Sequence, residues 1–269
     1  MSALFDLTGE IAVVIGGTGV LGGALAEGLA GAGALVAILG RNGDRGEACA
    51  ARIRHAGGEA AFFLADATDP ASLTQAHLAI EGGFGSPTVL VSAAGGNDPS
   101  VTVTAERPFE KINPADWRVN FDLNLVGGAL LPAQEFGPAM CRRGRGSIIN
   151  IASVAAHLPL SRVAAYSAAK AAVLNLSQFL AREWAPHGVR VNTLTPGFFP
   201  AEQNRRLLFD ENGQPSPRAQ SILGHTPMGR FGQPSELTGA VIFLASSAAS
   251  GFVTGIDLRV DGGFLAQTI

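Results

Sequence analysis

The sequence predicts an α/β fold: a single domain with one doubly wound parallel sheet of about seven strands and helices on both faces. Three observations predict it. Short apolar runs alternate with helix-length segments along most of the chain, which is the pattern of βαβ repetition. A glycine-rich stretch directly follows the first apolar run. The 269 residues, 47% of them hydrophobic, also suffice for one large core.

The first expected strand, residues 11–15, is a continuous apolar run of the kind found in strands buried on both faces. Gly17, Gly19 and Gly22 follow at the spacing of a dinucleotide-binding turn, and a helix is expected at 24–32. The missing side chains let backbone amides and the helix N-terminus approach a pyrophosphate. A plain tight turn is the alternative, because the chain contains 35 glycines.

The second expected strand, residues 34–39, ends at Gly40 and Arg41. Dinucleotide-binding folds commonly carry an acidic residue at this point, which binds the adenosine ribose. Without that carboxylate a 2′-phosphate is not repelled, and Arg41 can pair with it. The sequence therefore favours NADP(H) over NAD(H), with a merely solvent-facing Arg41 as the alternative.

The alternation continues to the end of the chain. Further strands are expected at 60–65, 88–92, 147–152, 189–194 and 256–260, and further helices at 44–56, 71–81, 115–137, 163–184 and 234–247. Parallel strands joined by right-handed crossovers place their carboxyl ends along one edge, where ligands bind. The segments that fall at this edge are Gly16, Gly40, Asp66, residues 93–95 and residues 195–197. Asp66 either takes part there or caps the turn that follows.

Tyr166 is the one tyrosine of the chain, and Lys170, one of two lysines, follows four residues later. On a helix this spacing puts both side chains on one face, where the ammonium can stabilise the deprotonated phenol. Such a phenol can serve as an acid or a base near neutral pH. An ordinary pair on a helix surface is the other interpretation. Asn124, in the long expected helix, needs partners if it is buried, either structural water or a proton relay.

Residues 198–230 interrupt the alternation with a long polar connection beside the ligand edge. A connection of this length favours a substrate-covering lid with short helices of its own. No repeat, linker or domain boundary is visible, so residues 1–269 are expected to form a single domain.

The bulk composition argues against several classes of partner. A formal net charge of −3 and a pI of about 5.9 give no electrostatic case for nucleic acid or a membrane surface. Cys49 and Cys141 lack metal-ligand spacing, so we expect free thiols and no metal site. No leader sequence or bilayer-length apolar run is visible. We therefore expect a cytoplasmic protein that acts on a small molecule.

Together these features resemble the short-chain dehydrogenase/reductase family, whose members have a Rossmann fold. The matching motifs cover nearly the whole chain: residues 16–22, 93–95 and 124–127, Ser153, Tyr166, Lys170 and residues 196–197. Ser153 stands thirteen residues before Tyr166, the spacing usual in that family. The resemblance implies an NAD(P)(H)-dependent oxidoreductase that interconverts a secondary alcohol and a ketone.

The resemblance also implies a role for each site residue. Tyr166 would donate or accept the substrate proton, and Ser153 would hold the substrate oxygen. Lys170 would lower the tyrosine pKa and bind the nicotinamide ribose, while Asn124 would carry a water that relays protons. The residues implied to bind the cofactor are Gly16, Gly17, Thr18, Gly19, Leu21, Gly22, Arg41, Asp66, Ala67, Ala94, Gly95, Tyr166, Lys170, Pro196 and Gly197.

Four positions depart from the family pattern. Val20 replaces a glycine that is usual in the first turn, residues 92–93 stand where two asparagines are common, and Ala201 stands where a threonine often binds the carboxamide. None of these positions carries the proton chemistry.

Within the family, residues 19–23, 94–97 and 196–232 resemble the D-mannonate oxidoreductase (fructuronate reductase) subgroup. This implies a sugar-acid substrate such as D-mannonate or D-fructuronate. Arg205 in the lid is the candidate partner for the carboxylate, with Gln203 and Asn97 available for hydroxyls. A solvated lid residue is the other interpretation of Arg205. Since the family usually forms dimers or tetramers, the resemblance also implies a homo-oligomer, such as a homotetramer.

Two other functions fit parts of the sequence. One is a general ketone or 3-oxoacyl reductase that uses NADP(H). The other, from a different class, is a dinucleotide-binding sensor without turnover. The presence of Ser153, Tyr166 and Lys170 argues against the sensor, because lost chemistry is expected to remove at least one member of a catalytic unit.

Overall fold

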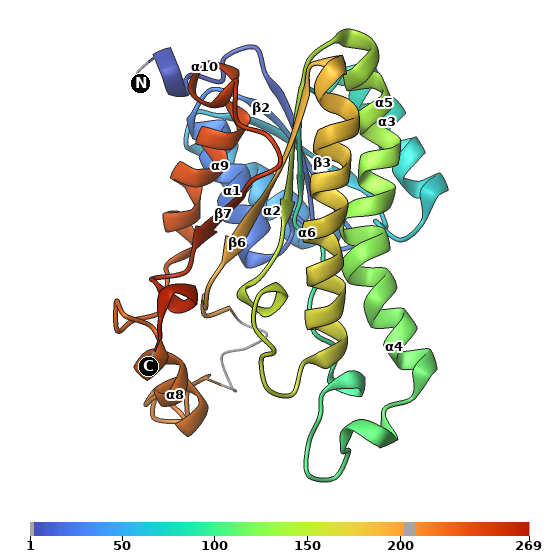
Figure 1. Ribbon diagram of the computed structural model, residues 1–269. Coiled ribbons are helices and arrows are strands. Elements are labelled where there is room, and N and C mark those ends of the chain that lie inside the picture. The colour runs from blue at the N-terminus through green and yellow to red at the C-terminus, as the bar shows by residue number, and fades with distance from the viewer. Residues whose placement is uncertain (1–2, 202–207, 269) are drawn as a thin grey trace.

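A parallel sheet runs through the middle of the molecule (Figure 1). The structure is a computed structural model that describes residues 3–201 and 208–268. Within these residues seven strands pair in the order β3-β2-β1-β4-β5-β6-β7. Their bounds are β1 Ile11–Ile15, β2 Leu35–Gly40, β3 Glu59–Leu64, β4 Val89–Ser92, β5 Gly146–Ile151, β6 Val189–Pro196 and β7 Asp257–Val260. The predicted fold class is confirmed. The first and last residues of each expected strand lie within two residues of those of the observed strand.

The order of the strands reverses direction between β1 and β4, which lie side by side in parallel with Ile15 opposite Ser92. From β1 the chain winds outward to β2 and β3, and from β4 it winds the other way to β7. Loops that follow β1 and β4 therefore separate at the carboxyl edge of the sheet. A crevice at such a switch point is where open α/β sheets bind their ligands.

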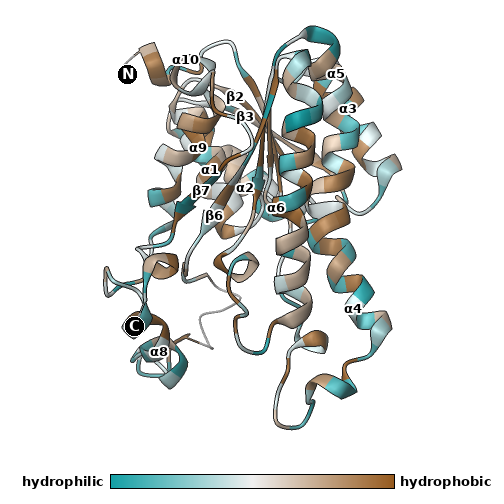
Figure 2. Cartoon of the chain, in the orientation of Figure 1, coloured by the Kyte–Doolittle hydropathy of each residue, from teal (hydrophilic) through white to brown (hydrophobic). Residues whose placement is uncertain are grey.

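Helices cover both faces of the sheet (Figure 1). The longer ones are α1 Val20–Gly31, α2 Gly43–His55, α3 Pro70–Gly83, α4 Pro114–Phe121, α5 Leu131–Arg143, α6 Ala164–Trp184, α8 Pro217–His225 and α9 Thr238–Ala245. One core packs α1, α2 and α9 on the sheet, and the other packs α3, α5 and α6. In the hydropathy colouring of Figure 2 the helices carry both colours, and β7 is partly teal. The apolar runs of β1, β2 and β4 are buried almost throughout, as expected for strands covered on both faces.

Short elements complete the described chain. They are η1 Ala3–Phe5, η2 Pro99–Val101, η3 Phe109–Lys111, η5 Val154–Ala156, η6 Ala185–His187, η7 Pro234–Leu237, α10 Ser247–Ser250 and η8 Phe264–Ala266. The helix expected at 234–247 is therefore divided into η7, α9 and the start of α10. Ser246 accounts for the last break, because its extended backbone ends α9 and its side chain accepts a hydrogen bond from Ala249 N in α10.

The helix expected over residues 115–137 is also not uniform. It consists of α4, then the π-helical stretch η4, Asp122–Leu130, and then α5, which runs on to Arg143. The apolar pattern is continuous across these pieces, so it predicted one helix. A π-helical stretch widens the turn without interrupting the helix, and such stretches are frequent at functional sites.

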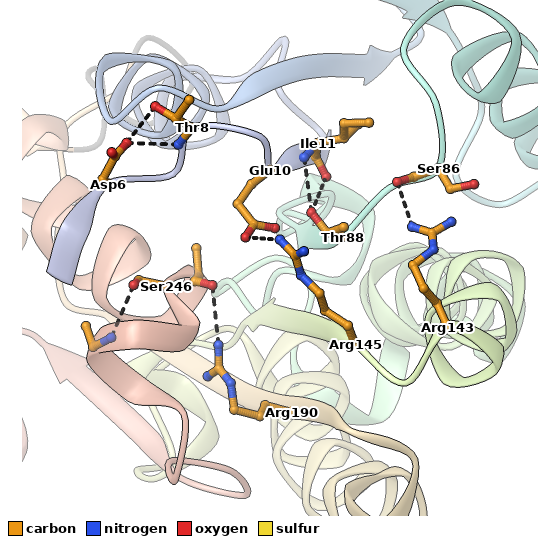
Figure 3. A network of polar contacts seen from close by, with 12 residues as sticks. Asp6, Thr8, Glu10, Ile11, Ser86, Thr88, Arg143, Arg145, Arg190 and Ser246 are labelled. Atoms are coloured by element: carbon orange, nitrogen blue, oxygen red, sulfur yellow. Dashed lines mark hydrogen bonds and ion pairs between the residues drawn. The ribbon is translucent and has the colours of Figure 1, made fainter. Parts of the chain in front are cut away.

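The edge of the sheet opposite the ligand edge is closed by a polar network (Figure 3). Arg190 of β6 is buried and donates to the carbonyl oxygen of Leu244 at 2.7 Å. Glu10 accepts from Arg145, and Thr88 Oγ1 accepts from Ile11 N at 3.1 Å. These bonds tie the amino ends of β1 and β6 to neighbouring segments, including the end of α9.

Candidate active site

The turn between β1 and α1 is packed too tightly for side chains. Gly16 has a φ of +78°, and its amide donates to Leu39 O at 2.9 Å. A Cβ atom would lie 2.6 Å from Ala94 N if added to Gly16, and 2.2 Å from Gly16 O if added to Gly22. The first turn of α1 begins at Gly19 without a side-chain cap. Its amides therefore stay available for an anion at the ligand edge, as a pyrophosphate requires.

Gly40 is glycine because Thr18 fills the space above it. A Cβ atom on Gly40 would lie 2.6 Å from Thr18 Cγ2. An acidic side chain therefore cannot stand at this point unless Thr18 moves. The neighbouring Arg41 is 70% exposed at its side chain. Within the described part of the chain it forms one ion pair, with Asp66, and at 4.0 Å that pair is long, so the guanidinium can turn towards a phosphate group.

Asp66 caps the turn that follows β3. Its Oδ1 accepts from the amide and the hydroxyl of Thr68, at 2.9 and 2.7 Å. These hydrogen bonds hold the pKa of the Asp66 carboxyl below its ordinary value. Capping was one of the two interpretations of Asp66, and the geometry supports it. The second carboxylate oxygen still faces Arg41, so Asp66 can orient that guanidinium as well.

Asn124 lies in η4, fully buried, and clamps the chain that follows β4. Its Oδ1 accepts from Gly96 N at 2.9 Å, and its Nδ2 donates to Gly96 O and to Asn120 O, both at 2.8 Å. A Cβ atom on Gly95 would lie 2.7 Å from Asn124 Oδ1. The amide of Asn124 is therefore satisfied by the chain itself, and a role in proton transfer stays a prediction.

Ser153, Tyr166 and Lys170 come together at the carboxyl end of β5. Ser153 is the N-cap of η5, where its Oγ accepts from Ala155 N at 3.2 Å. Tyr166 is half-buried in the first turn of α6, and its hydroxyl is hydrogen-bonded to Ser153. One turn later, Lys170 is only 3% exposed. Its Nζ donates to Ile151 O at 2.7 Å and lies 5.8 Å from the centre of the Tyr166 ring.

Burial controls the acidity of both members of the pair. It raises the pKa of the Tyr166 phenol, and the hydrogen bond with Ser153 opposes only part of that rise. It lowers the pKa of Lys170 to about 8. In the protein without a bound cofactor, the pKa of Tyr166 therefore lies above its ordinary value and not below it. The reason is that desolvation of the phenol outweighs the effect of its hydrogen bond with Ser153.

A contact that the sequence did not predict holds the turn carrying Ser153. His157 ends η5, and its Nε2 lies 3.0 Å from Asp257 Oδ2 of β7, with an angle too poor for a hydrogen bond. The other oxygen of Asp257 accepts from Thr193 and Thr195, at 2.7 and 2.6 Å. These partners stand far apart in the sequence and no spacing motif joins them. The pairing of β6 with β7 brings them together.

Pro196 and Gly197 lie where β6 leaves the sheet. Gly197 N donates to Val260 O at 2.9 Å, and a Cβ atom on Gly197 would lie 2.7 Å from Asp261 Cα. Beyond them a pocket of about 390 Å³ opens between residues 198–199 and the residues after β7. It is lined by Phe198, Phe199, Thr226, Met228, Arg230, Gly232, Glu236, Arg259, Val260, Asp261, Gly262 and Gly263.

Of the three candidate substrate residues, Asn97 lies in the described part of the chain. Gln203 and Arg205 lie outside the described residues. Asn97 is exposed, and its amide nitrogen donates to Thr102 Oγ1 at 2.6 Å, so its donor is used within its own loop.

Three further residues were expected to bind the cofactor. Ala67 and Ala94 line the edge next to Asp66 and Gly95, and Leu21 packs against the core below α1.

Residues 3–201 and 208–268 hold no group of three or more histidine, cysteine, aspartate or glutamate side chains that could bind a metal ion. In that part of the chain, no helix is both long and apolar enough to cross a membrane. Cys49 and Cys141 are free thiols, as expected.

Comparison with known proteins extends these observations. Residues 18–265 match a family model described as enoyl-(acyl carrier protein) reductase. The chain is 40% identical to the uncharacterized oxidoreductase UxuB of Bacillus subtilis (strain 168), over 98% of this chain and 97% of that protein.

Two solved structures are similar along almost their whole length. One, from Haemophilus influenzae, is provisionally assigned as a D-mannonate oxidoreductase and holds NAD. It has a TM-score of 0.92 and 38% identity, and the match covers 98% of this chain and 97% of that chain. The other is a gluconate 5-dehydrogenase from Burkholderia cenocepacia J2315 in complex with NADP and tartrate. It has a TM-score of 0.88, 37% identity and coverage of 98% of both chains.

Proposed function

The chain belongs to the short-chain dehydrogenase/reductase family, and we propose that it interconverts a sugar acid and its keto form with NADP(H) as cofactor. It is an NAD(P)-dependent oxidoreductase like its relatives. The observation that carries the proposal is the meeting of Ser153, Tyr166 and Lys170 beside a turn that only glycines can form. The likeness to the two structures above supports a sugar-acid substrate.

The residues at the edge fit a dinucleotide. The packed glycines of the first turn leave room for a pyrophosphate against the uncapped start of α1. Arg41 is exposed and weakly paired, and Gly40 leaves no carboxylate where one would bind the ribose, which together support a preference for NADP(H) over NAD(H). Such a cofactor supplies the hydride and, when oxidised, a positive charge at the site.

The chain itself handles the proton. In the direction of reduction, the Tyr166 hydroxyl donates its proton to the substrate oxygen, which Ser153 Oγ holds by a hydrogen bond. Lys170 then stabilises the phenolate, because its ammonium sits one helical turn away in a site with little water. In oxidation the same groups act in reverse. The raised pKa of Tyr166 keeps the phenol protonated and ready to donate.

A general ketone or 3-oxoacyl reductase is the second candidate, favoured by the description of the matching family model. Absorbance assays of reduced nicotinamide with both cofactors would separate the candidates on a panel of sugar acids, neutral polyols, simple ketones and a 3-oxoacyl thioester. We expect the highest kcat/KM on a sugar acid with NADP(H). Higher values on a simple ketone or a thioester would favour the second candidate, and binding without any turnover would favour a sensor.

A homo-oligomer and a cytoplasmic location, both expected from the sequence, stay predictions.

A further inference from the structure

The chain that leaves β4 turns at two adjacent glycines. Gly95 has a φ of +149° and Gly96 a φ of +159°, a backbone region that residues with a side chain rarely adopt. Two glycines in a row have great conformational freedom, so this turn keeps one shape only if contacts from outside hold it. Those contacts come from the helix that runs through α4 and η4.

Two buried asparagines of that helix hold the same carbonyl group. Asn124 donates to Gly96 O at 2.8 Å and accepts from Gly96 N at 2.9 Å. Asn120 lies one turn earlier and is 1% exposed, and its Nδ2 donates to the same oxygen at 3.1 Å. Both lone pairs of Gly96 O are therefore used. Since asparagine is a poor residue for a helix interior, its contribution at position 120 lies in this bond.

Gly95 connects these bonds to the buried lysine. A Cβ atom on Gly95 would lie 2.7 Å from Asn124 Oδ1 and 3.3 Å from Lys170 Nζ, so the backbone of Gly95 fills the space between the two side chains. Lys170 Nζ also donates to Ile151 O at 2.7 Å. The helices that carry the two side chains, α4 with η4 and α6, pack side by side (Figure 1). A small shift of Gly95 would press on the ammonium or open a gap beside it to water.

Asn192 is a buried asparagine of the same kind at the opposite edge of the sheet. It is fully buried, and its Nδ2 donates to a backbone carbonyl, Val253 O, at the same distance of 3.1 Å. That carbonyl belongs to the segment before β7. Loss of either asparagine removes a partner from a backbone carbonyl and costs stability. The difference is that the acceptor of Asn120 adjoins Gly95, which packs against Lys170.

We propose that Asn120 is a positioning residue for the proton transfer. Its amide fixes the turn of two glycines, and the turn keeps the ammonium of Lys170 beside Tyr166 and away from water. A dry, fixed ammonium stabilises a phenolate more strongly than a solvated one, because charges interact more strongly where the dielectric is low. This role applies to any alcohol or ketone that the site accepts, so it does not rest on the choice of a sugar acid.

The test uses the full chain and compares three variants with the wild type. Asn120→Leu keeps most of the side-chain volume and removes the donor. Asn120→Asp keeps the shape, and its carboxyl can donate to Gly96 O when it is protonated but not when it is ionised. Asn192→Leu is the matched control for a buried amide lost elsewhere.

The first readout follows Lys170 without cofactor or substrate. The chain contains two lysines, so ¹³C labelling at lysine Cε gives two NMR signals, one from Lys170 and one from the exposed Lys111. In Asn120→Leu we expect the pKa of Lys170 to rise from about 8 by about one unit or more, since water reaches the ammonium. In Asn192→Leu the pKa of Lys170 should stay at its wild-type value.

The second readout is kcat as a function of pH, measured by nicotinamide absorbance on the best substrate of the panel above. We expect Asn120→Leu to lower kcat about 10- to 100-fold and Asn192→Leu to change it less than about twofold, although both lower the melting temperature. Asn120→Asp should approach the wild-type kcat at low pH and lose activity as its carboxyl ionises, a step that the wild-type profile lacks.

Two results would overturn the positioning role: an unchanged pKa of Lys170 in Asn120→Leu, or an equal change of that pKa in Asn192→Leu. If Asn120→Leu does not fold, Asn120→Asp takes its place, and a wild-type pH profile with a wild-type Lys170 signal would overturn the role. If the wild type turns over no substrate of the panel, the proposed function fails, whereas the Lys170 signal still decides the role of Asn120.

Discussion

The charge of the Lys170 side chain is strongly disfavoured by its burial. It is 3% exposed, its Nζ has a carbonyl oxygen as its hydrogen-bond acceptor, and burial lowers its pKa from 10.5 to about 8. Burial of a charge destabilises the folded chain unless the charge is lost or paired. Tyr166 shows the opposite direction for the same reason, since burial favours its neutral phenol. Function at this site therefore has a cost in stability.

That cost should be visible as a pH dependence. Between pH values of about 8 and 10.5 the unfolded chain binds a proton on Lys170 that the folded chain does not, so stability rises with pH across this window. Below pH 8 the full cost, at most about 3 kcal/mol, is present. In urea unfolding without cofactor, we expect the wild-type chain to gain about 2 kcal/mol relative to Lys170→Met between pH 8 and pH 10. Parallel curves for the two proteins would contradict the buried ammonium.

Tyr166→Phe tests the proton donor. The substitution removes the hydroxyl beside Ser153 and keeps the ring, so cofactor binding should be retained while kcat falls by about 10³-fold or more. Cofactor affinity is measured by fluorescence titration, and turnover by nicotinamide absorbance. A variant with near-normal kcat would exclude Tyr166 as the donor.

Elements show what sequence patterns could and could not predict. Strands β1, β2 and β4 were predicted because each is an apolar run, and the glycine turn because its spacing is a backbone requirement. Polar residues interrupt β6 and β7, which were predicted from their place in the alternation of strands and helices. The π-helical stretch η4 was not predicted, since a shift in hydrogen-bond register leaves the apolar pattern unchanged. The contact of His157 with Asp257 was missed for another reason. It depends on which strands pair, and that information is absent from local spacing.

The turn η5 should depend on this contact. Asp257 is anchored by two threonine hydroxyls and faces His157 at the end of the turn that begins with Ser153. We expect Asp257→Leu to lower kcat about tenfold by loosening Ser153, with cofactor affinity unchanged, and Asp257→Asn to retain more of the activity. Asp44→Asn, on the exposed start of α2, is the control. Equal kinetics for Asp257→Leu and the control would show that the pair does not position Ser153.

At the scale of the molecule, the two edges of the sheet differ in how far their polar groups are paired within the chain. The amino edge is closed by bonds such as those of Arg190 to the carbonyl oxygens of Leu244 and Ala245. The pair of Glu10 and Arg145 lies nearby (Figure 3). The carboxyl edge collects glycines packed too tightly for a side chain, the buried ammonium of Lys170 and the weakly paired Arg41. Unsatisfied charge and amides at one edge mean that a ligand bound there stabilises the whole fold, because it binds the folded chain and not the unfolded one.

Cofactor binding should therefore raise the melting temperature, and the size of the shift reports the preference without any substrate. At a concentration of about 100 times Kd, a ligand adds about 2.7 kcal/mol, which for a chain of this size corresponds to a shift of roughly 5 to 10 °C. We expect NADPH to give a larger shift than NADH at equal concentration. Because Arg41 is exposed and only weakly held by Asp66, Arg41→Ala should reduce the NADPH shift to that of NADH and leave the NADH shift unchanged. Arg182→Ala serves as the control for a lost surface charge. Equal shifts for both cofactors in the wild-type chain would mean that Gly40 and Arg41 together do not select the 2′-phosphate.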